Sequence, residues 1–187
     1  MTDRAYEGQC AIVTGAASGI GRAIAQRLAD GGANVAVVDR DLAGAKATVA
    51  AIQGAGGNAV AIDADVSQAA DVVAAVAGAV RAFGSPVILV NDAGVARMGR
   101  VDRLSEDDWD LCMAVNLRGC FLFSREAIPL MVERRYGRII SISSGTAIRV
   151  GPGTSAYAAS KAGIIALTKA TAGEVDAAFF RCHPRTC

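Results

Sequence analysis

The stretch TGAASGIG, residues 14–21, joins a short apolar run at 10–14 to a segment of helical periodicity. Its three glycines are Gly15, Gly19 and Gly21. Glycine permits a tight strand-to-helix turn and lets backbone amides approach a pyrophosphate at the positive N-terminus of the helix. The spacing is GxxxGxG and not GxGxxG, and any tight turn before a helix can use glycine. Taken alone, the stretch leaves a phosphate-binding turn and a purely structural turn equally open.

Short apolar runs alternate with longer helical segments along most of the chain. The runs are CAIVT at 10–14, NVAVVD at 34–39, NAVAID at 58–63, PVILVN at 86–91 and GRIISIS at 137–143. Continuous apolar strands separated by helices indicate a parallel sheet that is buried on both faces. We therefore predict an α/β fold with a doubly wound parallel sheet and helices on both faces. The expected helix boundaries are a cap at Ser105 and Asp108, ends at Gly31–Gly32 and Gly56–Gly57, and a last helix from near Ser155.

The bulk properties limit the possible functions. A chain of 187 residues suits one domain, which we place at residues 1–175, followed by an atypical tail at 176–187. The net charge of +1, with acids and bases interspersed, gives no footprint for nucleic acid. Charges interrupt every apolar stretch before a membrane span is reached, and the first ten residues do not resemble a secretory signal. We expect a cytoplasmic protein with neither nucleic-acid nor membrane partners.

Cysteine and histidine usage argues against metal and disulfide chemistry. The five cysteines are scattered, odd in number and without a CxxC pair, which favours reduced thiols over a zinc site or disulfide framework. The chain has one histidine, His183, which lies in the atypical tail. A Ser-His-Asp or Cys-His site would have to use it, far from the other polar clusters. We therefore expect no metal and a catalytic base other than histidine.

An acidic residue ends the second apolar run. Asp39 lies 18 residues after Gly21, where a carboxylate can accept hydrogen bonds from an adenosine ribose 2′-OH and repel a 2′-phosphate. This favours NAD over NADP as cofactor. The alternative is that Asp39 only starts a turn before the next helix. Arg40 follows directly and softens the expected preference.

Seven motifs occur in one order along residues 8–174. They are TGAASGIG, Asp39, DADV at 63–66, NDAG at 91–94, Asn116, the serine pair at 143–144 and YAASK at 157–161. In this order they resemble the short-chain dehydrogenase/reductase family, whose fold is Rossmann-like. The resemblance implies cofactor-binding roles in the glycine turn and beyond, for Gly15, Ser18, Gly19, Ile20, Gly21, Asp39, Asp65, Val66, Asn91, Ala93, Gly94, Tyr157 and Lys161. Where the family has NNAG this chain has NDAG, so Asp92 replaces an amide with a group that, when ionised, can only accept hydrogen bonds.

A tyrosine and a lysine four residues apart open the last helical segment. Tyr157 and Lys161 therefore share one helix face. A phenol is a poor base at neutral pH, and a nearby ammonium favours the phenolate, which makes proton exchange with a hydroxyl feasible. In isolation such a pair is typical of a solvated helix face. The family resemblance adds Ser144 to hold the substrate oxygen and Asn116 to hold a water that links the lysine to solvent. It implies hydride transfer between a nicotinamide cofactor and an alcohol or ketone.

The last residues depart from the family pattern. VDAAFFRCHPRTC at 175–187 has no counterpart to the strand expected there, so we predict a fold truncated after the helix that follows the fifth strand. The edge of the fifth strand and one face of the last helix would then be open. Two hypotheses follow, an active dehydrogenase and a truncated NAD-binding subunit without turnover. The resemblance also implies a homo-dimer or homo-tetramer that pairs through the long helix and the last helix.

Overall fold

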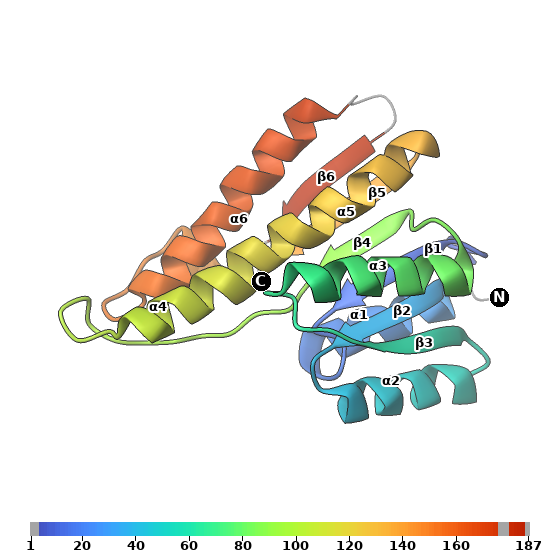
Figure 1. The fold of residues 1–187 in the computed structure, drawn as a ribbon, viewed down its shortest axis with the longest axis horizontal. Coiled ribbons are helices and arrows are strands. Elements are labelled where there is room, and N and C mark those ends of the chain that lie inside the picture. The colour runs from blue at the N-terminus through green and yellow to red at the C-terminus, as the bar shows by residue number, and fades with distance from the viewer. Residues whose placement is uncertain (1–3, 176–179, 186–187) are drawn as a thin grey trace.

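Six parallel strands form one sheet in the order β3-β2-β1-β4-β5-β6 (Figure 1). The computed structural model describes residues 4–175 and 180–185. The strands are β1 (Cys10–Thr14), β2 (Asn34–Asp39), β3 (Asn58–Asp63), β4 (Ile88–Asn91), β5 (Gly137–Ile142) and β6 (Phe180–Arg185). The doubly wound parallel sheet predicted from the alternating runs is confirmed. β4 begins two residues later than the apolar run does, and Pro86 has no N–H to donate to a ladder.

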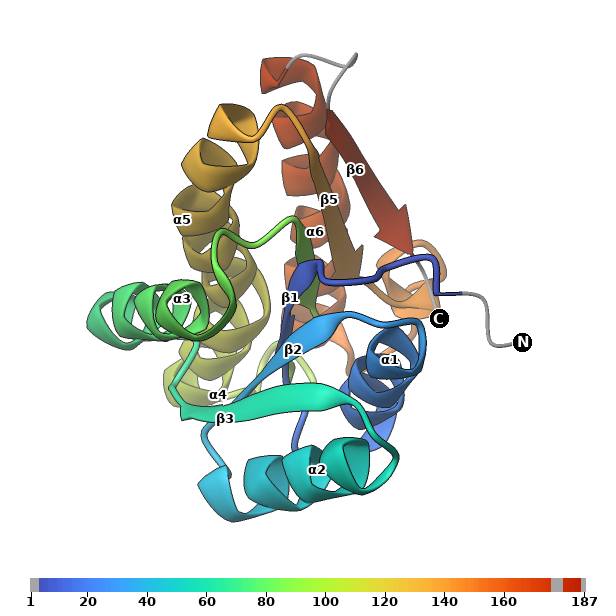
Figure 2. The ribbon, with the colours of Figure 1, turned by 90° about the vertical axis from the view of Figure 1, so that its right-hand side faces the viewer.

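Helices connect successive strands and cover both faces of the sheet. They are α1 (Gly19–Asp30), α2 (Leu42–Gly54), α3 (Ala69–Phe83), α4 (Glu106–Cys112), α5 (Gly119–Glu133) and α6 (Ser155–Glu174). A π-helical segment, η1 (Met113–Arg118), makes α4 and α5 one continuous helix, and a short 3₁₀ turn, η2 (Gly145–Ala147), follows β5. Figure 2 shows α1 and α2 on one side of the sheet and α3 and α5 on the other.

Each face of the sheet has its own apolar core because the strands are buried on both sides. Ile12 and Leu89 pack with Phe123 of α5 on one face, and all three are essentially inaccessible to solvent. Val13 and Val37 pack with the alanines of α1 and α2 on the other. Residues that alternate along a strand point to opposite faces. Continuous apolar runs such as CAIVT therefore supply both cores.

The helix boundaries follow local signals in the sequence. The Ser105 side chain accepts a hydrogen bond from the Asp108 N–H at 3.1 Å, so the predicted N-cap is confirmed. Gly32, with φ +91°, and Gly56, with φ +84°, follow α1 and α2 in a conformation that favours glycine. The last helix begins at Ser155, as expected.

The end of the chain contains a short strand that the apolar pattern does not predict. β6 pairs with β5 in parallel from Gly137↔Phe180 to Ile142↔Arg185, along the edge of β5 that the sequence left without a recognisable partner. Strand pairing uses backbone groups, and an edge strand tolerates polar residues and proline that a central strand would not. The apolar pattern therefore missed FRCHPR. The rest of the atypical tail, residues 176–179 and 186–187, lies outside the described residues.

The strand order reverses beside β1. β1 pairs with β2 on one side and with β4 on the other, and β2 and β4 are reached by connections that run in opposite directions. In open α/β sheets a crevice forms at such a reversal, beyond the carboxyl ends of the strands. The fold thus brings the ends of β1, β2, β4 and β5 to one place.

Candidate active site

A cavity of about 530 Å³ lies at the carboxyl ends of strands β1 to β5. Pockets for small molecules and cofactors occupy roughly 300–1,000 Å³, so this one suits an organic ligand rather than an ion. Twelve of the fifteen residues predicted for cofactor binding or catalysis line it: Gly15, Ser18, Gly19, Ile20, Asp39, Asp65, Val66, Ala93, Gly94, Ser144, Tyr157 and Lys161. The other three, Gly21, Asn91 and Asn116, are buried and do not line it.

The glycine turn is packed too tightly for side chains at two positions. Gly15 has φ +69°, and a Cβ there would lie 2.8 Å from both Cα and N of Ala93. A Cβ on Gly21 would lie 2.4 Å from the carbonyl oxygen of Gly15. Gly19, with φ +54°, has no neighbour within 4 Å of a Cβ and faces the cavity. The turn therefore brings the N-terminus of α1 directly to the cavity.

Two side chains that the sequence analysis missed hold this turn from behind. Arg22 donates through Nε to the Ala17 carbonyl at 3.1 Å, and also contacts Thr48 at 3.2 Å. The Thr48 hydroxyl donates to the Ala16 carbonyl at 2.9 Å and is buried. The Ala16 and Ala17 carbonyls lie 32 and 31 residues before Thr48 in the chain, so no local pattern could have identified Thr48 as a residue of the turn.

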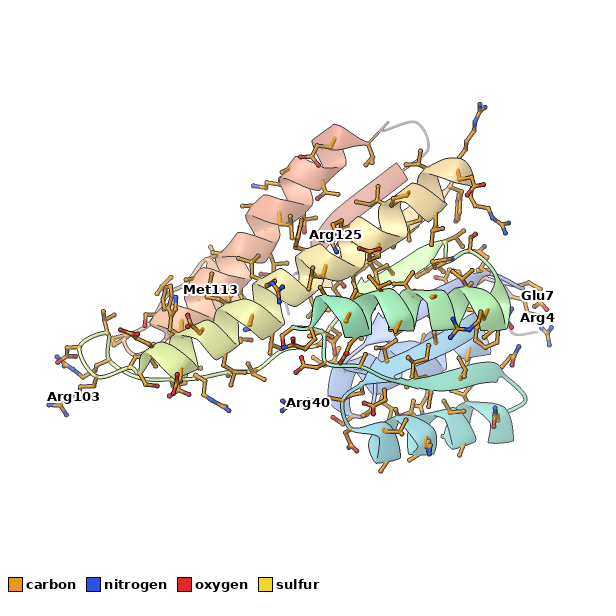
Figure 3. All side chains as sticks on the ribbon, in the orientation of Figure 1. Arg4, Glu7, Arg40, Arg103, Met113 and Arg125 are labelled. Carbon is orange, nitrogen blue, oxygen red and sulfur yellow. The ribbon has the colours of Figure 1, made fainter. Side chains whose placement is uncertain are left out.

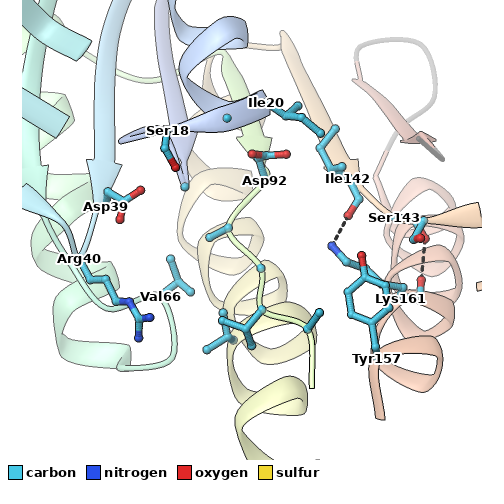
Figure 4. A pocket seen from close by; sticks show the side chains of 18 of the residues that line it. Ser18, Ile20, Asp39, Arg40, Val66, Asp92, Ile142, Ser143, Tyr157 and Lys161 are labelled. Atoms are coloured by element: carbon cyan, nitrogen blue, oxygen red, sulfur yellow. Dashed lines mark hydrogen bonds between the residues drawn. The ribbon is translucent and has the colours of Figure 1, made fainter. Parts of the chain in front are cut away.

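Asp39 is oriented by backbone amides on both sides of it. Its Oδ2 accepts from the Ala17 N–H at 3.0 Å, and its Oδ1 accepts from the Asp41 N–H at 3.0 Å. The carboxylate thus links the glycine turn to the end of β2 while one edge lines the cavity. Arg40 beside it is exposed and also lines the cavity (Figure 4).

The segment after β4 is held by Thr14 of β1. The Thr14 hydroxyl oxygen accepts from the N–H groups of Asp92 and Ala93, at 3.1 and 3.2 Å. Asn91 is buried and donates to Ser124 at 3.4 Å and to Ser141 at 3.3 Å. Its role here is to tie β4 to β5 and α5 below the cavity floor.

The Asp65 carboxylate is hydrogen-bonded to Ser67. Its Oδ1 accepts from both the N–H and the hydroxyl of Ser67, at 2.8 and 2.7 Å. Val66 beside it is buried and packs against Gly119, where a Cβ would lie 2.9 Å from the valine Cγ2. These contacts fix the wall at the carboxyl end of β3.

Tyr157 and Lys161 enter the opposite end of the cavity from α6 (Figure 4). Lys161 is only 4% exposed, and its Nζ donates to the Ile142 carbonyl at 2.8 Å. The same Nζ lies 5.8 Å from the centroid of the Tyr157 ring. The Tyr157 ring and the buried Lys161 side chain thus lie together at this end of the cavity. The pair does not lie on a solvated helix face, which was the alternative to a functional role.

The two serines after β5 have different partners. Ser143 is buried and donates to the Lys161 carbonyl at 2.8 Å, so its hydroxyl joins β5 to α6. Ser144 is half-buried, donates to Thr146 Oγ1 at 3.2 Å and accepts from the Thr146 N–H at 3.2 Å. Ser144 is therefore the more accessible of the two at the cavity wall, although both line it.

Asn116 lies in η1 and is 1% exposed. Its Oδ1 accepts from the Val95 N–H at 2.7 Å, while its Nδ2 donates to the Val95 carbonyl and to Ser160, each at 2.9 Å. Asn116 Oδ1 and Lys161 Nζ each lie 3.3 Å from the position a Cβ would take on Gly94. The asparagine thus ties the segment after β4 to α6 beside the lysine.

Asp92 is an ionisable group of the cavity whose pKa is shifted by its surroundings. Burial raises the pKa of its carboxyl group, an effect that the nearby Lys161 ammonium and the Gly21 amide only partly offset. The folded chain therefore holds this proton more tightly than the unfolded chain does. The associated stability is fully present below the ordinary pKa of about 4 and is lost as pH rises through the raised value.

No group of three or more His, Cys, Asp or Glu side chains that could hold a metal occurs in the part of the chain that the structure describes. Among the same residues, no helix is both long and apolar enough to cross a membrane.

Known proteins are similar in sequence to this chain over most of its length. A family model described as short chain dehydrogenase matches residues 9–180. A 3-oxoacyl-(acyl-carrier-protein) reductase of Thermotoga maritima is 36% identical over 169 residues, which are 90% of this chain and 69% of that protein. A D-threitol dehydrogenase of Mycolicibacterium smegmatis is 41% identical over 172 residues, 92% of this chain and 66% of that protein.

A third relative covers a larger share of the chain. A 2,3-dihydro-2,3-dihydroxybenzoate dehydrogenase of Bacillus subtilis is 37% identical over 183 residues, which are 98% of this chain and 70% of that protein. The names of the three relatives give three different substrates, so similarity alone does not select one. The resemblance inferred from the seven motifs is confirmed, and the chain belongs to the short chain dehydrogenase family.

Proposed function

We propose that the chain transfers a hydride between NAD and a small alcohol or ketone. Family membership makes it an oxidoreductase with a nicotinamide cofactor, and NAD, the reacting group and the catalytic residues are the proposed part. The observation that carries the proposal is that Ser144, Tyr157 and Lys161 share one cavity with the glycine turn and Asp39. These residues come from segments up to 146 positions apart, since the cavity runs from Gly15 to Lys161.

The residues present fit a dinucleotide. The crowded backbone at Gly15 and Gly21 leaves the N-terminus of α1 free to meet a pyrophosphate. Asp39 would hold the adenosine ribose, Asp65 and Val66 would border the adenine, and Ala93, Gly94, Tyr157 and Lys161 would hold the nicotinamide half. When bound, the nicotinamide supplies the hydride acceptor or donor.

The proton chemistry belongs to the chain's own side chains. Tyr157 would exchange a proton with the substrate hydroxyl through its phenol oxygen. Lys161, held at 2.8 Å by the Ile142 carbonyl, would favour the ionised phenol. Ser144 would hold the substrate oxygen, and Asn116 would hold a water between Lys161 and solvent. The Asn116 side chain already bonds Val95 and Ser160, so it is rigid enough for that role.

Turnover and binding distinguish this proposal from the second hypothesis. The purified chain is mixed with NAD and a panel of secondary alcohols, and NADH formation is followed by its absorbance while NAD binding is measured by calorimetry. NADH formation supports the dehydrogenase. Binding of NAD without turnover on any alcohol or ketone would favour an NAD-binding subunit that does not itself catalyse.

The cytoplasm remains the predicted location of the protein.

The preference for NAD depends on Asp39. In Asp39→Asn the negative charge that repels a 2′-phosphate is lost while Arg40 remains beside it. We expect the ratio of NADP to NAD affinity to rise about tenfold or more, since roughly 1.4 kcal/mol of lost repulsion gives that factor. Calorimetric Kd values for both cofactors test this. Asp30→Asn, at the exposed end of α1, should leave the ratio unchanged. An unchanged ratio in Asp39→Asn would contradict the assignment.

We also propose that copies of the chain associate through the face formed by α4, η1, α5 and α6. A shallow, mostly apolar groove crosses it, lined by Asp110, Met113, Ala114, Leu117, Arg118, Phe121, Gly163 and Leu167. Met113, labelled in Figure 3, marks its position between η1 and α6. Phe121 is 43% exposed there, an unusual state for a large aromatic side chain.

A charged side chain introduced into this groove should prevent two copies of the chain from associating. In Phe121→Glu we expect the native mass measured by light scattering to fall to that of a single chain, because a carboxylate cannot be buried in an apolar interface. Val73→Glu, which alters an exposed apolar residue of α3, should keep the native mass of the unmodified protein. A Phe121→Glu protein that keeps the larger mass would exclude this face as the interface.

A further inference from the structure

Asp92 is a charged group in the cavity that the proposed reaction does not use. Figure 4 shows it between the end of the cavity that holds Asp39 and the end that holds Tyr157 and Lys161. Its backbone N–H donates to Thr14 at 3.1 Å, so the residue has a fixed position on the strand end. The side chain is half-buried.

The carboxyl group lies against the first turn of α1. A Cβ on Gly21 would be 2.9 Å from Asp92 Oδ2 and 2.4 Å from the Gly15 carbonyl oxygen. The helix N-terminus is the place where backbone amides and the helix dipole attract an anion. A carboxylate at this point competes with a pyrophosphate for the same amides and repels it.

The other ionisable groups of the cavity do not duplicate this position. Lys161 and Tyr157 line it from α6, Asp39 and Arg40 from the end of β2, and Asp65 from the end of β3. Of these, Lys161 affects Asp92 through its charge. A carboxylate here would therefore carry an unfavourable charge beside a phosphate, partly compensated from the lysine side.

We propose that Asp92 makes dinucleotide binding proton-linked, so that the protein with a protonated Asp92 binds NAD more tightly than the protein with an ionised Asp92. The inference rests on the proposed function, because it requires the pyrophosphate to sit at the α1 N-terminus. The reaction is the uptake of one proton from solvent by one carboxylate, which leaves a neutral carboxylic acid beside the phosphates.

The sign of the linkage follows from the charges. Burial already raises the pKa of Asp92, and the negative phosphates of a bound cofactor raise it further. Binding must then take up protons at any pH between the pKa of the free protein and that of the complex. NAD affinity falls as pH rises through this interval. At the few ångströms expected between carboxylate and phosphate, the loss is on the order of tenfold.

Calorimetry gives a direct readout that does not depend on turnover. NAD is titrated into the full chain in buffers with different ionisation enthalpies, at pH values from about 4 to 7, spanning the ordinary carboxyl value and the range above it. We expect a fractional proton uptake per NAD bound and a Kd that weakens about tenfold across the series. In Asp92→Asn, which keeps the side-chain size and an acceptor oxygen, the uptake should vanish and the Kd should become nearly constant. Asp63→Asn, an exposed carboxylate at the end of β3 outside the cavity lining, should behave like the unmodified protein.

The outcomes separate the inference from the function beneath it. Equal proton uptake in the unmodified protein and in Asp92→Asn would overturn the inference and leave NAD binding established. A Kd independent of pH in the unmodified protein would overturn it too, without reliance on any variant. If neither protein binds NAD at any pH, the proposed function fails and the inference fails with it.

Discussion

Replacing Tyr157 by phenylalanine is expected to lower kcat by about 10²–10⁴-fold, because the chain loses the group that exchanges the substrate proton. The ring remains, and with it the contact in which Lys161 Nζ lies 5.8 Å from the ring centroid. NAD affinity should therefore change little. Steady-state rates with the best alcohol of the panel, together with calorimetric Kd values for NAD, measure both effects on one sample.

A second tyrosine provides the matched control. Tyr136 follows α5, is 40% exposed and stacks with the Arg138 guanidinium at 4.7 Å, outside the cavity lining. Tyr136→Phe makes the same chemical change and should retain full turnover. If Tyr157→Phe kept its kcat, the phenol would have no part in proton transfer, and the assignment of the catalytic site would be wrong.

Replacing Gly21 by alanine is expected to weaken NAD binding by more than about tenfold. The new Cβ would lie 2.4 Å from the Gly15 carbonyl oxygen and 2.9 Å from Asp92 Oδ2, both closer than real contacts allow. The turn must move away from α1, which takes its amides out of line with the pyrophosphate. Overpacking of this kind also lowers the free energy of unfolding by about 1–3 kcal/mol. Calorimetry and urea unfolding measure the two effects.

Gly54 shows what the same substitution does without crowding. It ends α2, and a Cβ there meets nothing within 4 Å. Gly54→Ala should keep NAD affinity and gain up to about 1 kcal/mol of stability, since alanine is the better helix former. Normal NAD binding by Gly21→Ala would show that the close packing of this turn is not what presents the amides.

Asp92 links the packing of Gly21 to the pH dependence of the stability of the fold. Because burial raises the pKa of its carboxyl group, the ionised form is less favoured in the folded chain than in the unfolded chain. The same packing that makes Gly21 intolerant of a methyl group holds the carboxylate near Lys161 and the α1 N-terminus. The aspartate in NDAG thus places a titratable group beside the first turn of α1.

The strand positions and the glycine turn could be predicted because they depend on neighbours in the chain. A run such as CAIVT is apolar at every position since both faces of a central parallel strand are buried. Ser105 caps α4 through a residue three positions away, and the φ values of Gly15 and Gly19 reflect a tight local turn. The positions of Tyr157 and Lys161 on one helix face follow from the period of the helix.

β6 shows the limit of that reasoning. FRCHPR has no continuous apolar run, and its inclusion in the sheet depends on the backbone edge that β5 presents after the crossover through α6. An edge partner needs only hydrogen-bonding geometry. A method based on side-chain pattern could not find it.

The local pattern of residues was sufficient for the parallel sheet and the glycine turn, because each depends on residues a few positions apart. The serine, tyrosine and lysine of the proposed site were predicted only with the family resemblance of the ordered motifs. The tertiary structure was needed for Arg22 and Thr48 behind the turn, for Asn116 bound to both Val95 and Ser160, and for Asp92 against Gly21. Those partners are 21 to 71 positions apart in the chain, and they meet because separate strands end at one edge of the sheet. Periodicity encodes which face a side chain takes, whereas packing between elements decides which atoms it touches.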